Sequence, residues 1–60
     1  MPSLIPVTLE EQIASIEREI ALRERVYPRW VADKKMSAAK AEKEIDAMKA
    51  VLETLKGFQT

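Results

Sequence analysis

The chain has 60 residues, of which 47% are hydrophobic and 33% are charged, and its formal net charge is zero. A chain of this length buries only about 60% of the surface that its unfolded form exposes, so its core is marginal when it folds alone. It contains no cysteine and no histidine, which excludes disulfides and closed His/Cys zinc sites as means of stabilisation. Self-association is the remaining means of stabilising so small a domain. The length allows only one domain.

The cellular compartment is expected to be the cytoplasm. The absence of cysteine fits a reducing cytosol. The first residues show no basic segment followed by a long apolar run, so they do not resemble a secretory signal. No stretch approaches the roughly 20 apolar residues of a membrane span. We therefore expect a cytoplasmic protein without a membrane partner.

Residues 1–7 are predicted to form an extended N-terminal arm. Pro2 and Pro6 disfavour helix in the residues that precede them. The arm either folds over its own domain, frays, or lies across a partner subunit.

A first helix is predicted at about residues 9–32. Thr8 and Glu11 have the spacing of a capping box. Apolar side chains then recur at alternating spacings of three and four, the pattern of an antiparallel coiled-coil seam. This stripe consists of Leu9, Ile13, Ile16, Ile20, Arg23 and Tyr27. Its one charged member, Arg23, either extends to the edge of the seam or is a buried charge kept for an anionic partner.

Pro28 falls within this helix and removes one backbone hydrogen bond, so the helix either kinks there or ends just before it. The residues at 29–32 are not turn formers, which favours a kinked helix that continues to about residue 32. Residues 33–36 then form the connection to a second helix, a typical length for an antiparallel helix pair.

The second helix is predicted at about residues 37–56, with Ser37 as its N-cap. Its apolar stripe consists of Ala38, Ala41, Ile45, Met48, Leu52 and Leu55. Gly57 is suited to end the helix, and Phe58 continues the stripe only if the helix persists beyond it. Together the stripes predict an all-α fold, in which residues 8–60 form a coiled-coil-like antiparallel two-helix hairpin.

A second apolar strip on the first helix consists of Leu22, Val26 and Trp30. At 100° per residue, Leu22 lies on the opposite side of the helix from Ile20. One hairpin partner cannot cover both strips, so the second strip is the predicted oligomer interface. We expect a homo-oligomeric helical bundle, with a dimeric four-helix bundle favoured.

The turn end of the hairpin is basic. Residues 23–40 carry a net charge of +4, whereas residues 8–22 carry −3. Arginines and an aromatic face can bind a phosphate-bearing ligand. The candidate ligand-binding residues are Arg23, Arg25, Tyr27, Arg29, Trp30, Lys34 and Lys35. The alternative is a solvated helix end with two core aromatics. A compact anion or an acidic protein patch suits this end better than DNA does, because the whole chain is neutral.

No catalytic, cofactor or metal site is expected. Without histidine or cysteine, the chain lacks an ordinary general base near neutral pH and a thiol nucleophile. Carboxylate pairs such as Glu42 and Asp46 lie among lysines and are typical of surface charge. The sequence contains no glycine-rich phosphate loop and no metal-ligand spacing.

Residues 18–31, followed by Lys35-Met36-Ser37 and by residues 41–52, resemble a family of small, mostly uncharacterised proteins from tailed phages and prophages. The Val-Tyr-Pro-x-Trp-Val core at residues 26–31 is the most specific part, and the resemblance covers roughly residues 9–55. It implies phage origin and the host cytoplasm. The family has a glycine at the turn, where this chain has Asp33 or Lys34. The resemblance supplies no settled biochemical role.

The favoured hypothesis is a non-enzymatic phage accessory protein that acts by binding. It would counteract a host defence or regulatory system by sequestering a nucleotide signal or a host protein. A structural or regulatory protein-protein interaction module is the alternative, and a nucleic-acid-binding accessory protein is a weaker one.

Overall fold

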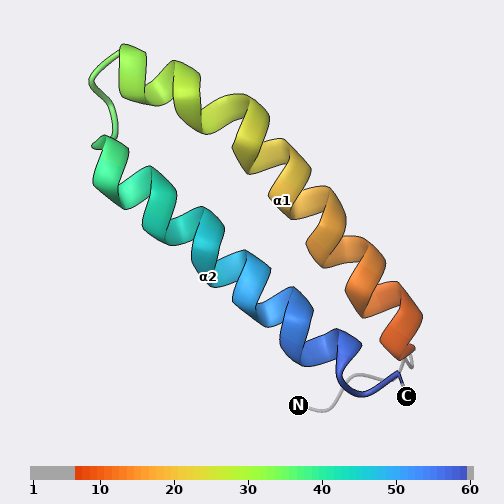
Figure 1. Ribbon diagram of the computed structural model, residues 1–60. Coiled ribbons are helices and arrows are strands. Elements are labelled where there is room, and N and C mark those ends of the chain that lie inside the picture. Colours follow the sequence, from red (N-terminus) through yellow and green to blue (C-terminus); the bar gives the residue numbers. More distant parts are fainter. Residues whose placement is uncertain (1–6, 60) are drawn as a thin grey trace, which may run out of the picture.

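The computed structural model describes residues 7–59. Two helices, α1 (Leu9–Ala32) and α2 (Ala38–Lys56), lie side by side in opposite directions and are joined by a short turn (Figure 1). No strand occurs in the described part of the chain, and neither helix there is long and apolar enough to cross a membrane. The predicted all-α two-helix fold is confirmed. The predicted N-terminal arm, apart from Val7, lies outside the described residues.

Both helices begin at the N-caps that the sequence predicts. The Thr8 hydroxyl accepts a hydrogen bond from the backbone N–H of Glu11 at 3.0 Å. The Ser37 hydroxyl accepts one from the N–H of Lys40 at 3.1 Å. Each cap satisfies a backbone donor that the first turn leaves without a helical partner, which stabilises a helix by about 1 kcal/mol.

Helix α1 continues through Pro28 and ends at Ala32. The proline lacks the N–H that would reach the carbonyl of Glu24. Pro28 is exposed, so water can hydrogen-bond this carbonyl, and the helix tolerates the lost bond on its solvent side.

The two predicted stripes meet along one seam. Its most buried side chains are Ile13 and Ile20 of α1 and Ala41 of α2, each 7% exposed. Ala38 is the exposed member of the stripes. The other members are partly buried, namely Leu9, Ile16, Arg23, Tyr27, Ile45, Met48, Leu52 and Leu55. Phe58 does not extend the stripe, because α2 ends at Lys56 and the Phe58 side chain is 71% exposed.

The turn after α1 is a Schellman motif. The N–H of Lys34 donates to the carbonyl of Val31 at 3.0 Å, and the N–H of Lys35 donates to that of Trp30 at 2.9 Å. Lys34 has a φ of 60°, the left-handed conformation in which this motif usually holds glycine. The only glycine of the chain, Gly57, has a right-handed conformation instead.

We predict that Lys34→Gly raises the free energy of unfolding by about 1 kcal/mol. A left-handed conformation costs a residue with a Cβ atom about 1–2 kcal/mol, and glycine avoids this cost. Urea denaturation followed by circular dichroism measures the change. Lys35→Gly is the matched control, because it removes the same charge at the next position, where φ is not positive. An equal gain in both variants would contradict the explanation.

Candidate functional site

Arg23 joins the two helices at the edge of the seam. Its Nε donates to Glu19 Oε1 at 2.9 Å, and its Nη1 donates to the backbone carbonyl of Glu44 at 3.2 Å. The Glu44 carboxylate lies 3.7 Å from Nη1. The hydrogen bond to Glu19 raises the pKa of Arg23 above its usual value and outweighs the lowering by partial burial. Arg23 is therefore a paired charge within the hairpin.

An aromatic pair continues from Arg23 along α1. The Arg23 guanidinium lies 5.8 Å from the centroid of the Tyr27 ring, which is a cation–π distance. The rings of Tyr27 and Trp30 stack with centroids 5.6 Å apart and planes inclined by 27°. Tyr27 is partly buried in the seam, whereas the Trp30 side chain is 41% exposed. The row of contacts from Arg23 through Tyr27 therefore ends at Trp30, on the surface.

The three residues of the predicted oligomer interface lie together on that surface. Leu22 is 43% exposed, and Val26 is partly exposed. With Trp30, Tyr27, Glu19 and Arg23 they line a groove of about 330 Å³. The groove lies on α1 and contains mainly apolar side chains, which makes it suitable for another apolar surface.

Arg25 and Arg29, which are four residues apart on α1, lie along one edge of this strip. With Val26 and Trp30 they line a neighbouring hollow of about 280 Å³. Within residues 7–59, neither arginine forms an ion pair or donates a side-chain hydrogen bond. Two uncompensated guanidinium groups beside an exposed indole provide the chemistry that binds a phosphate and stacks on a base.

Lys34 and Lys35 belong to the turn that follows α1. They line a hollow of about 440 Å³ at the turn, together with Val31, Met36, Ser37 and Ala38. The seven predicted ligand-binding residues therefore separate into three groups. Arg23 and Tyr27 take part in the packing of the hairpin, Arg25 and Arg29 lie beside Trp30 on the surface, and the two lysines lie at the turn.

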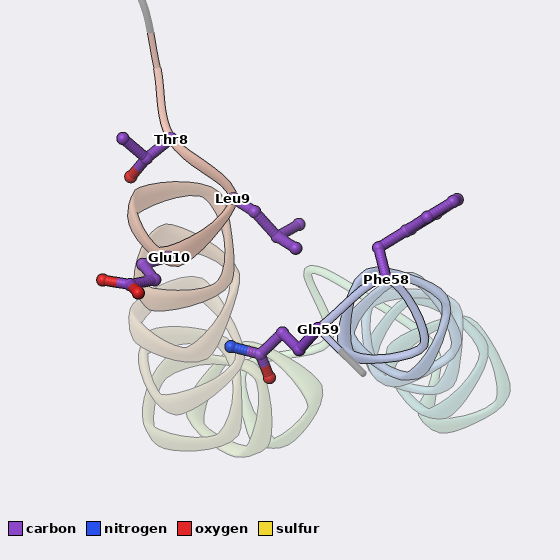
Figure 2. Close-up of a pocket in the computed structure, with 5 residues that line it drawn as sticks. All are labelled: Thr8, Leu9, Glu10, Phe58 and Gln59. Carbon is purple, nitrogen blue, oxygen red and sulfur yellow. The ribbon is translucent and has the colours of Figure 1, made fainter.

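At the opposite end, a hollow of about 390 Å³ lies between the helix termini and is lined by Thr8, Leu9, Glu10, Phe58 and Gln59. Leu9 and Gln59 point toward the space between the helices, whereas Phe58 points away from α1 (Figure 2). Among the described residues that line it, Glu10 alone has a charged side chain. This hollow offers no constellation for chemistry.

Val51 of α2 is a surface residue that sequence reasoning missed, with a side chain that is 38% exposed. It immediately precedes the seam residue Leu52, so its side chain lies about 100° round the helix from the seam. The available signal was a large apolar residue outside the three-four stripe of the second helix.

No protein-family model matches the chain, and no similar protein is found among curated proteins or solved structures. Function is therefore inferred from the side chains and their arrangement.

We predict that Arg23→Ala lowers the free energy of unfolding by about 1 kcal/mol, because it removes two hydrogen bonds and leaves Glu19 without its partner. Arg25→Ala is the matched control, since Arg25 is exposed on the same helix, and its effect should stay within about 0.5 kcal/mol. Urea denaturation at one fixed protein concentration measures both. Equal effects would show that Arg23 does not join the helices.

Proposed function

We propose that the chain is a non-enzymatic accessory protein of a tailed phage, which acts by binding in the host cytoplasm as a homo-oligomer. The observation that carries the proposal is the exposed apolar strip of Leu22, Val26 and Trp30 beside the seam. The phage assignment is supported by the Val-Tyr-Pro-x-Trp-Val core at residues 26–31. A role in binding rather than catalysis is supported by a sequence without histidine or cysteine.

The small core of the hairpin supports self-association. Only three side chains of the described residues are buried, whereas large apolar side chains of the strip stay in water. Covering a leucine or an aromatic side chain fully contributes about 1.5–3 kcal/mol. Several such residues in one interface are needed to offset the cost of association. A dimeric four-helix bundle is the smallest assembly that covers the strip on both copies.

We predict that sedimentation equilibrium at micromolar concentration detects a dimer, and that Leu22→Glu converts it to a monomer because a charge enters the strip. Ala21→Glu is the matched control. It adds the same charge at the neighbouring exposed position, 100° away on the helix, and should leave the dimer intact. A folded wild-type monomer at these concentrations would contradict self-association.

A second binding role is supported by Arg25, Arg29 and Trp30. Their uncompensated positive charge and exposed indole fit a nucleotide, so the protein would counteract a host defence or regulatory system by sequestering a nucleotide signal. The other candidate ligand for these positive charges is a host protein with an acidic patch. If neither binds, the protein is a structural or regulatory interaction module whose aromatics serve packing. Nucleic-acid binding would instead show a steep salt dependence in a gel shift.

We predict that calorimetry against cyclic and linear nucleotides detects binding to the wild type, and that the double variant Arg25→Ala/Arg29→Ala loses it. Lys34→Ala/Lys35→Ala is the matched control, because it removes two positive charges from the separate hollow at the turn. It should retain binding. An absence of heat with every nucleotide at micromolar protein would contradict the small-molecule role.

A further inference from the structure

The two broad sides of the hairpin differ in chemistry. Arg23 pairs with Glu44 across one side of the seam, and Lys49 Nζ lies 3.4 Å from Glu24 Oε2 across the other. Arg23 and Glu24 are neighbours 100° apart on α1, so the two ion pairs mark opposite sides of the seam.

The side of the Arg23 pair carries the exposed large apolar side chains of the two helices, together with Lys40, which precedes Glu44 by four residues. Leu22, Val26 and Trp30 line the groove that also contains Arg23. On α2, Ala47 and Val51 follow Glu44 by three and seven residues, which places them on its side of the helix. These exposed or partly exposed residues form the apolar face: Leu22, Val26, Trp30, Ala47 and Val51. The opposite side carries charged residues at helical spacing around Glu24 and Lys49, namely Glu17, Glu42, Asp46, Glu53 and Lys56.

The broad side of the hairpin on which the apolar face lies is large enough for a stable dimer interface. The hairpin measures 40 × 27 × 18 Å. The area of its broad side is therefore comparable to the area that each partner contributes to a standard interface, which is about 800 Å². Its radius of gyration is 14.1 Å, against about 10 Å for a compact domain of this length. A second hairpin laid on this face converts an open pair of helices into a closed four-helix bundle.

The charge of the hairpin changes sign along its length. The first half of α1, residues 9–20, contains four glutamates and one arginine, whereas the second half, residues 21–32, contains three arginines and one glutamate. The turn half of the whole hairpin, residues 21–48, has a net charge of +2. The terminal half, residues 8–20 and 49–59, has −2.

We propose that a second copy of this chain docks on the apolar face with its turn end over the terminal end of the first. The inference rests on the self-association proposed above and adds its face and its orientation. The two-fold axis lies across the helices, so α1 packs beside α1 of the second copy and α2 beside α2, each pair antiparallel. The positive half of each copy then lies against the negative half of the other, whereas stacking the two turns together would oppose like charges.

The pairing of Arg23 suits this arrangement. Its guanidinium lies at the edge of the apolar face, where the second copy would cover it. An uncompensated buried charge would oppose docking, but Glu19 and Glu44 already compensate Arg23 within one copy.

Cross-linking tests the orientation, because the chain has no cysteine of its own. Lys40→Cys lies on α2 near the turn, Thr54→Cys lies near its other end, and both positions are exposed. In the proposed dimer α2 is antiparallel to its counterpart about the middle of the helix, so position 40 of one copy faces position 54 of the other. A short bismaleimide should therefore link the two variants when they are mixed and leave each variant alone largely unlinked.

Salt and charge removal provide a second measurement on the same dimer. Raising sodium chloride from about 50 to about 500 mM should weaken dimerisation several-fold, because it screens attraction between opposite ends. Arg25→Gln/Arg29→Gln should weaken it also. Cross-links within each variant alone, or a dimer strengthened by salt, would overturn the orientation while leaving self-association in place. A monomer in sedimentation would overturn both.

Discussion

A helix with a single neighbour can bury only one stripe of its surface, and this constraint explains most of what the hairpin shows. The seam occupies that stripe on both helices, and Ile13, Ile20 and Ala41 lie at its centre. Any further apolar side chain must remain in water or find another partner. The strip that contains Leu22 and Trp30 is in this position, so the limited thickness of the fold and the proposed association have the same physical cause.

Arg23 shows how a charge is accommodated in such a thin structure. It occupies a seam position, yet its guanidinium reaches the edge and bonds to groups on both helices. The Arg23 side chain therefore extends to the edge of the seam, which is the first of the two predicted alternatives. Its charge is paired with groups inside the hairpin. Arg25 and Arg29 of the same helix have neither an ion pair nor a side-chain hydrogen bond within the described residues, so their charge is available at the surface.

The features that the sequence predicted well are local. The caps at Thr8 and Ser37 and the alternating three-four spacing depend on residues within one or two helical turns. The partnership of Arg23 with Glu44 spans 21 residues and depends on how the helices are aligned along each other. The left-handed conformation of Lys34 is also local, but lysine has no preference for it. Its one sign in the sequence is the resemblance to a family with a glycine at Asp33 or Lys34.

The predicted ligand-binding residues fall into separate groups because of helix geometry, although they are close together in the sequence. Residues 23–35 are neighbours in sequence, but each step along a helix turns the side chain by 100°. Arg23 and Tyr27 therefore enter the seam region, and Arg25 and Arg29 lie outside it. Lys34 and Lys35 fall beyond the end of α1 altogether.

The short turn also sets the order of assembly in time. Contacts near the turn close small loops and those near the termini close larger ones, so zippering outward from residues 33–37 has the lowest entropic cost. Helical hairpins dominated by such local contacts fold in microseconds to milliseconds. Two copies at micromolar concentration meet more slowly, at typical association rates of about 10⁵–10⁷ M⁻¹s⁻¹. In the proposed association, newly made chains would therefore meet as preformed hairpins, each with its apolar face already in place.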